Sequence, residues 1–166
     1  MADPVYNAQV ICEQAKEAAE HGAKIVVFPE LCITGYTCND LFLQELLLEK
    51  AKEALLTIAE ETGQLETLFL VGLPVDKDGR LYNVAAVLYR GRILGMIPKK
   101  NIPMYAEFYE GRHFTPGEET VTEYRLGKQV IPFGSNLLFR CEELPELILG
   151  CELCEDLWVA EPPSTS

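Results

Sequence analysis

Near its C-terminal end the chain reads Glu146-Leu147-Ile148-Leu149-Gly150-Cys151-Glu152-Leu153-Cys154-Glu155-Asp156-Leu157-Trp158. The apolar run 147–149 predicts a buried strand, because a short continuous apolar segment is typical of a strand covered on both faces. The polar residues Cys154, Glu155 and Asp156 follow it. A side chain at the end of a buried strand is held by the core and can still meet a substrate, so the Cys154 thiol is a candidate for catalysis. The alternative is that Cys154 is a small buried hydrophobe, as cysteines often are.

Length and composition limit the class of protein. The chain has 166 residues, of which 48% are hydrophobic, and this is enough for one domain with its own core. The net charge of −12 argues against nucleic acid, which requires a basic face, and against an anionic membrane surface. No apolar run approaches the roughly 20 residues of a membrane span, and the N-terminus lacks the basic and apolar regions of a signal peptide. We therefore expect a cytoplasmic protein.

The 6 cysteines are expected to be free thiols in that compartment. Cys151 and Cys154 form a Cys-x-x-Cys pair. A zinc site would need a second such pair or histidines at ligand spacing, and His21 and His113 do not provide it. We expect no metal site, and a redox or metal protein built on this pair is the most remote alternative.

Hydrophobic periodicity predicts the order of the elements. A 3.6-residue pattern predicts a helix over 7–21 that stops at Gly22, and a second helix from an Asp40 N-cap to Gly63 with Leu43, Leu46 and Leu47 on its apolar stripe. Between them, the β-branched run 24–28 predicts a buried strand. Further strands are predicted at 68–73, 81–89, 93–97, 129–133 and 136–139, with turns at 76–79 and 90–92 and an ordered irregular segment at 101–120.

This order predicts an α/β fold with a mixed sheet that is covered by helices on one face. The opposite face of the sheet is also apolar, so we expect it to pack on a second sheet. The complete architecture would be a layered α-β-β-α sandwich.

Polar residues follow the predicted strands at equivalent places. Glu30 follows strand 24–28, Lys99 follows strand 93–97 and Cys154 follows the C-terminal strand. Side chains at strand ends converge on one crevice in layered α/β proteins. A thiol with a free pKa of about 8.5 needs a base near neutral pH, a carboxylate can be that base, and a lysine can stabilise the oxyanion that forms when the thiolate attacks a carbonyl. These residue types together suit acyl transfer from an amide, although each alone could be a salt-bridge partner or a core thiol.

The chain also resembles a known family. The segments Val27-Phe28-Pro29-Glu30-Leu31, Pro98-Lys99-Lys100-Asn101-Ile102-Pro103 and Glu152-Leu153-Cys154-Glu155-Asp156-Leu157-Trp158 are similar to the Glu, Lys and Cys motifs of the nitrilase, or carbon–nitrogen hydrolase, superfamily. The segments 33–42 and 105–110 are similar to one branch of it, the glutamine amidohydrolase domains of glutamine-dependent NAD synthetases. The resemblance runs from about Ile25 to Trp158 and implies a nitrilase-like sandwich.

The resemblance implies roles for individual residues. Glu30 would be the general base, Cys154 the nucleophile and Lys99 the oxyanion partner, because the family's lysine stands four residues before a proline that matches Pro103. Glu107 matches a second carboxylate that many members place near the lysine. The glutamine pocket of the family is matched by Tyr105, Phe108, Glu155 and Trp158, and the backbone N–H of Glu155 would complete the oxyanion hole.

The larger departure from the family is length. A nitrilase domain is considerably longer and starts with a strand before the first helix, so we expect a partial domain over 1–166 with the ATP-using synthetase domain absent. The resemblance implies glutamine as substrate, no cofactor for its hydrolysis, and ATP and Mg only in the synthetase domain of the parent chain. Nitrilase-like domains usually assemble, so a homo-oligomer is expected. The alternatives are a free-standing amidase acting on another small amide and a non-catalytic interaction module.

Overall fold

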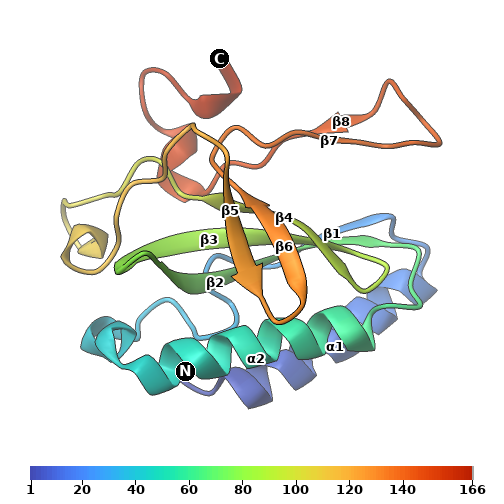
Figure 1. The fold of residues 1–166 in the computed structure, drawn as a ribbon, viewed down its shortest axis with the longest axis horizontal. Coiled ribbons are helices and arrows are strands. Elements are labelled where there is room, and N and C mark those ends of the chain that lie inside the picture. The colour runs from blue at the N-terminus through green and yellow to red at the C-terminus, as the bar shows by residue number, and fades with distance from the viewer. Residues whose placement is uncertain (166) are drawn as a thin grey trace.

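The computed structural model describes residues 1–165, in which two long helices cover one face of a six-stranded sheet (Figure 1). Its strands are β1 (Ile25–Val27), β2 (Leu68–Lys77), β3 (Arg80–Tyr89), β4 (Arg92–Pro98), β5 (Thr122–Leu126) and β6 (Gln129–Phe133), in the spatial order β1-β2-β3-β4-β6-β5. β1 runs parallel to β2 and β4 parallel to β6, while the remaining neighbours are antiparallel. The predicted mixed sheet is therefore present.

Helix α1 (Pro4–Glu20) begins three residues before the predicted start, because the sequence supplies a cap there. The Asp3 side chain accepts the Tyr6 N–H at 3.1 Å, and Pro4 occupies the first turn, where a proline costs no hydrogen bond. The helix packs through small side chains such as Ala8 and Ala15. Within residues 1–165, no helix combines the length and apolar character needed to cross a membrane.

The predicted start of the second helix is wrong. A 3₁₀ helix, η1 (Asn39–Leu43), comes first, and α2 (Glu45–Glu61) begins only after Gln44. Asp40 lies inside η1 and binds Arg112 instead of capping α2. Leu43 and Leu46 consequently point outward and are 63% and 69% exposed.

The β2–β3 hairpin is longer than predicted. Asp76 pairs with Leu81 and Lys77 with Arg80, so the turn is confined to Asp78-Gly79. Both residues have positive φ, 53° and 74°, as a two-residue hairpin turn of the right twist requires. β5 was not predicted: it is an edge strand in which only two side chains, Tyr124 and Leu126, are buried.

The two faces of the sheet differ in how they are covered. The face toward the helices is the main core, with Phe69, Val71 and Leu73 of β2 buried against α1 and α2. The opposite face is covered only in part, by segments around Leu137, Phe139 and Leu153. β1 was predicted to be buried, but Ile25 is 41% and Val27 70% exposed on this side, because the segments that cover this face leave a groove open over the strand.

The strand predicted at the C-terminal end is not buried and does not join the main sheet. β8 (Ile148–Leu149) pairs with β7 (Phe139–Arg140) as a separate two-stranded sheet, so the strand predicted at 136–139 overlaps β7 only at its last residue. This hairpin lies above the open face of the sheet (Figure 1), and Phe139 and Leu149 line a groove with residues of β1 and β2, while Ile148 is 46% exposed. Burial resumes at Leu153, which packs with the partly covered sheet face. The segment 101–120 is largely irregular as predicted and contains a short 3₁₀ helix, η2 (Glu110–Arg112).

Candidate active site

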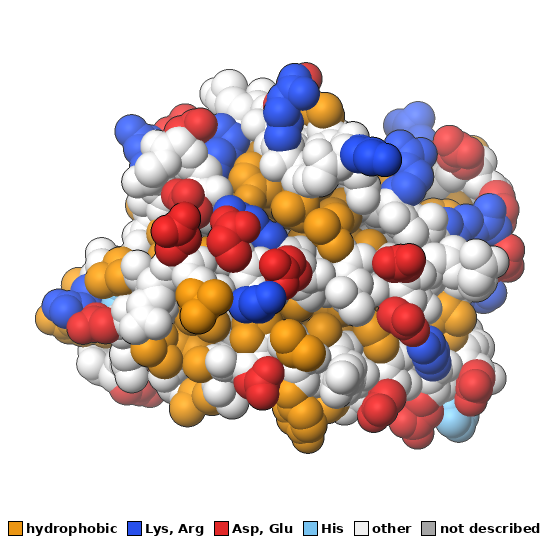
Figure 2. Space-filling view, turned by 60° about the horizontal axis from the view of Figure 1, so that its bottom comes forward, with side chains coloured by type: hydrophobic (Ala, Val, Ile, Leu, Met, Phe, Trp, Pro, Cys, Tyr) orange, Lys and Arg blue, Asp and Glu red, His pale blue; other side chains and the backbone are white. Residues whose placement is uncertain are grey.

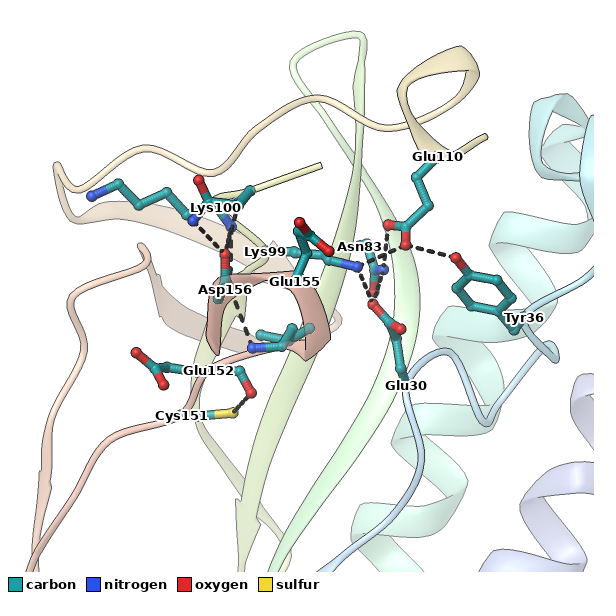
Figure 3. Close-up of polar contacts among 12 residues, drawn as sticks. Glu30, Tyr36, Asn83, Lys99, Lys100, Glu110, Cys151, Glu152, Glu155 and Asp156 are labelled. Atoms are coloured by element: carbon teal, nitrogen blue, oxygen red, sulfur yellow. Dashed lines mark hydrogen bonds and ion pairs between the residues drawn. The ribbon is translucent and has the colours of Figure 1, made fainter. Parts of the chain in front are cut away.

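Glu30 is placed by a turn that presses against β2. After β1 the chain still pairs with β2 through the Phe28 N–H and the Leu70 carbonyl at 2.9 Å, and then Leu31 adopts a left-handed φ of 52°. A Cβ on Gly72 would lie 2.4 Å from the Leu31 nitrogen, so only glycine allows this approach. The turn directs the Glu30 side chain along the sheet toward the end of β4 (Figure 3).

Lys99 follows β4 directly and is fully buried. Its Nζ donates to Glu30 Oε1 and to Glu110 Oε1, both at 2.7 Å (Figure 3). Lys100 faces away and pairs with Glu119 at the surface. The structure therefore places Lys99, as predicted, and not Lys100, beside Glu30.

The second carboxylate at Lys99 is Glu110, whereas the sequence analysis assigned this place to Glu107. Glu107 is exposed. The backbone turns at Ala106 with a φ of 52°, and η2 then directs Glu110 inward, where its side chain is 5% exposed. The Tyr36 hydroxyl donates to Glu110 Oε1 at 2.8 Å. Glu110 was part of the motif segment 105–110, but its inward orientation depends on a turn that the pattern does not reveal.

Asn83 on β3 also belongs to the site and was missed. It is fully buried, and its Nδ2 donates to Glu30 Oε1 at 2.7 Å and to Glu110 Oε2 at 3.2 Å. Its Oδ1 is buried without a hydrogen-bond partner among the described residues. A reversed amide would place that oxygen against two carboxylates, so the orientation is set by charge. A lone polar residue inside the apolar strand 81–89 was the available signal.

The site holds a single lysine against two carboxylates. Burial works to lower the pKa of Lys99, but its hydrogen bonds to Glu110 and Glu30 outweigh burial and raise that pKa. Lys99 is therefore a cation at neutral pH. Since Nζ carries three N–H groups and two are used, one remains for a substrate oxygen. For Tyr36, burial and then the Glu110 hydrogen bond raise the hydroxyl pKa, so it stays a donor.

Cys154 begins the 3₁₀ helix η3 (Cys154–Leu157) in a left-handed conformation with a φ of 46°. Its pKa is raised by desolvation and then by the charge of Glu30, while Lys99 acts in the opposite direction. The thiol is exposed at the surface, and the charges of Glu30 and Lys99 both act on its pKa. Among the described residues, both donors to Glu30 bind Oε1, so Oε2 is the oxygen left for the thiol proton.

The predicted substrate-binding residues are only partly brought together. The Tyr105 hydroxyl donates to Glu155 at 2.7 Å, and the Tyr105 and Phe108 rings pack edge to face with centroids 5.7 Å apart. The pKa of Tyr105 is raised chiefly by its hydrogen bond to Glu155, then by desolvation, and the charge of Cys154 adds to the shift. Trp158 stands apart, with its side chain 73% exposed.

Comparison with known proteins settles the family. Residues 1–163 match the family described as carbon-nitrogen hydrolase. The chain belongs to the carbon–nitrogen hydrolase family. An amidase of the nitrilase superfamily from Nesterenkonia superposes with a TM-score of 0.59 at 24% identity, over 78% of this chain and 49% of that one. The predicted nitrilase-type α/β fold is thus confirmed for this carbon–nitrogen hydrolase, with one helical layer and one sheet of the predicted sandwich in the described residues.

Its similar relatives include larger enzymes. Glutamine-dependent NAD(+) synthetase of Mycobacterium tuberculosis is 40% identical over 164 residues, which are 99% of this chain and 24% of that protein. The enzyme of the same name from Thermotoga maritima is 33% identical over 160 residues, 96% of this chain and 24% of that protein. A crystal structure of a glutamine-dependent NAD(+) synthetase from Cytophaga hutchinsonii gives a TM-score of 0.82 at 31% identity, covering 90% of this chain and 25% of that one. The chain spans about a quarter of the length of these relatives.

Proposed function

We propose that this carbon–nitrogen hydrolase domain hydrolyses the side-chain amide of glutamine. The observation that carries the proposal is the buried network in which Lys99 binds Glu30 and Glu110, whose charges all act on the pKa of the Cys154 thiol. It supplies a nucleophile, a base and a cation for an oxyanion. Glutamine is favoured as the amide because the similar relatives are named glutamine-dependent.

The geometry suits a two-step acyl transfer. Glu30 Oε2 takes the Cys154 proton, and the sulfur attacks the amide carbon. The oxyanion accepts hydrogen bonds from Lys99 and from the backbone N–H of Glu155. When this intermediate collapses, Glu30 returns the proton to the leaving nitrogen, ammonia departs and a γ-glutamyl thioester remains. Glu30 then deprotonates water, which attacks the thioester, and the Cys154 thiol is regenerated as glutamate leaves.

The destination of the ammonia is part of the same proposal. In the relatives' architecture a synthetase domain would receive it and use ATP and Mg to amidate an adenylated nicotinic acid dinucleotide. The Glu30, Lys99 and Cys154 site itself would need neither. We propose a cytoplasmic setting for this chemistry, since the free thiol of Cys154 must remain reduced.

The proposal is tested with Cys154→Ala in the complete gene product that carries these residues. Glutamine-driven synthesis should fall to background, while synthesis from added ammonia should persist, because only the amide-cleaving step needs the thiol. Cys151→Ala is the matched control: burial, followed by the charges of Asp156 and Glu152, raises the pKa of that thiol to about 11, so it should be dispensable. Equal loss of both activities would make Cys154 structural, and hydrolysis of other small amides but not of glutamine would identify a different amidase.

A further inference from the structure

Asp156 is a buried carboxylate whose partners are N–H groups. It lies in η3, two residues after Cys154, and its relative exposure is 2%. Among the described residues it forms no ion pair with a lysine, arginine or histidine within 4.0 Å; its hydrogen bonds all come from backbone amides and one asparagine side chain. A buried charge of this kind is costly unless its oxygens are well satisfied, so its hydrogen bonds must stabilise a particular arrangement.

The contacts of Asp156 join the two halves of the site (Figure 3). Oδ1 accepts the Asn101 N–H at 2.7 Å, the Asn101 Nδ2 at 2.9 Å and the Lys100 N–H at 3.2 Å, and Oδ2 lies 3.4 Å from the same Lys100 nitrogen. Oδ2 also accepts the Leu153 N–H at 3.2 Å. Lys100 is the residue after Lys99, and Leu153 is the residue before Cys154. One carboxylate therefore connects the segment that carries Lys99, the proposed oxyanion partner, to the segment that carries the nucleophile Cys154.

Other supports for the Cys154 turn are weak. η3 spans only 4 residues of 3₁₀ helix, a conformation with little stability of its own. β8 is a 2-residue strand outside the main sheet, so it does not hold the turn against β4. Cys154 also has a left-handed φ of 46°, which a non-glycine residue adopts only when its surroundings impose it. The main remaining anchors are the buried Leu153 side chain, the Asp156 carboxylate and, at the exposed surface, the Glu155 carboxylate that accepts the Tyr105 hydroxyl.

We propose that Asp156 is a positioning residue that holds the Cys154 turn in register with Lys99. The proposal rests on the proposed glutamine hydrolysis. In that reaction the Cys154 sulfur must reach the substrate carbonyl carbon while the Lys99 ammonium binds the carbonyl oxygen. A shift of about 1 Å between groups that must act together can cost about 100-fold in rate. Loss of the Asp156 hydrogen bonds should therefore impair catalysis without changing any residue that touches the substrate.

The test uses the complete gene product with Asp156→Asn and, as the matched control, Glu152→Gln. The control removes the same charge from a carboxylate that also accepts a backbone N–H, that of Ser164 at 2.7 Å, but does not contact the Lys99 segment. The first probe is a diazoketone analogue of glutamine and the second is iodoacetamide, with Cys154 labelling followed by mass spectrometry. In Asp156→Asn we expect labelling by the analogue to slow about 10- to 100-fold, while iodoacetamide labelling is not slowed. Both rates should be unchanged in Glu152→Gln.

A third measurement does not depend on glutamine. In the wild type, the pKa of Cys154 is raised by desolvation and by the charge of Glu30. A turn released by Asp156→Asn leaves that environment, so the pH midpoint of iodoacetamide labelling should fall further than in Glu152→Gln. If Asp156→Asn does not fold, Asn101→Ala, which removes one donor at 2.9 Å, should show the same changes to a smaller degree. A wild-type midpoint and a wild-type analogue rate in these variants would overturn the inference. A wild-type protein that ignores the analogue would refute the glutamine proposal instead, and the midpoint would still decide the role of Asp156.

Discussion

At the residue scale, the chemistry depends on which oxygen of the Glu30 carboxylate is hydrogen-bonded and which is free to take a proton. Lys99 and Asn83 both bind Oε1 of Glu30, and this leaves Oε2 for proton transfer. Glu110 balances the charge of Lys99 and is fixed in turn by Tyr36. The base is thereby oriented by neighbours that do not themselves exchange protons with the substrate.

Replacement of the base should slow glutamine hydrolysis strongly. Glu30→Gln keeps the side-chain shape but cannot accept the thiol proton, so the rate of ammonia release should fall about 10²–10⁴-fold. Glu107→Gln is the matched control, because this carboxylate is exposed and lies outside the network. An unchanged rate in Glu30→Gln would remove Glu30 from the mechanism and direct attention to Glu110.

The same substitution should make the Cys154 thiol ionise at lower pH, although it slows glutamine hydrolysis. After desolvation, the charge of Glu30 is the largest cause of the raised pKa of Cys154. Glu30→Gln removes that charge, so the pH at which Cys154 becomes half-labelled by iodoacetamide should fall while glutamine hydrolysis slows. A midpoint that stays in place or rises would show that Glu30 is not next to the thiol.

At the element scale, the position of Glu30 depends on the close approach of its turn to β2. The Ile33 N–H donates to the Gly72 carbonyl at 3.1 Å, and a side chain at Gly72 would collide with the backbone of Pro29 and Leu31. The site is therefore built on a contact between backbones, which no side-chain rearrangement can replace.

Gly72→Ala should destabilise the fold and displace Glu30. Overpacking of this kind typically costs about 1–3 kcal/mol, and the turn must move because backbone atoms are the obstacle. Gly95→Ala on β4 is the control: its Cβ would meet the side-chain ends of Leu137 and Phe139 at 2.9 Å, which can shift. Chemical denaturation and ammonia release should both be affected more by Gly72→Ala. Equal effects of the two substitutions would argue against a special role for the turn.

At the scale of the whole molecule, the helical and the open sides of the sheet present different surfaces. On the face shown in Figure 2, acidic and basic side chains are interspersed and apolar atoms are exposed between them. On the open side of the sheet, a shallow groove is lined by apolar residues, among them Ile25, Val27, Leu70 and Val87. A contiguous apolar surface of this kind is typical of an interaction site.

The purified 166-residue chain should therefore self-associate through the open sheet face, and more strongly at high salt, since its net charge of −12 opposes association and salt screens it. Val27→Lys should weaken the association, because this side chain is 70% exposed in the groove. Val5→Lys in α1, where the valine is 56% exposed on the helical side, should leave it unchanged. Sedimentation velocity measures all three chains, and a strictly monomeric wild type would contradict the prediction.

The sequence by itself was enough to predict the strands that precede Glu30 and Lys99, but not the exposed two-residue strand that precedes Cys154. β-branched and apolar runs predict the two strands, and a polar residue directly after a strand lies at its end, so Glu30 and Lys99 are predicted to lie close together. Their contact at 2.7 Å agrees, although β1 is more exposed than its sequence predicts. The choice of Lys99 over Lys100 came from the resemblance to the family, whose lysine stands four residues before a proline, and the buried ammonium agrees with it.

Only the tertiary structure decided which carboxylate faces Lys99 and which faces are covered. The resemblance pointed to Glu107, whereas the left-handed turn at Ala106 and η2 direct Glu110 toward Lys99. The apolar run 147–149 predicted burial, but a strand is buried only where other layers pack on it, and this one lies in a separate two-stranded hairpin over an open groove of the main sheet. Hydrophobic periodicity shows that a segment favours burial. Which layer buries that segment, and which charged side chain pairs with Lys99, depends on contacts between residues far apart in sequence.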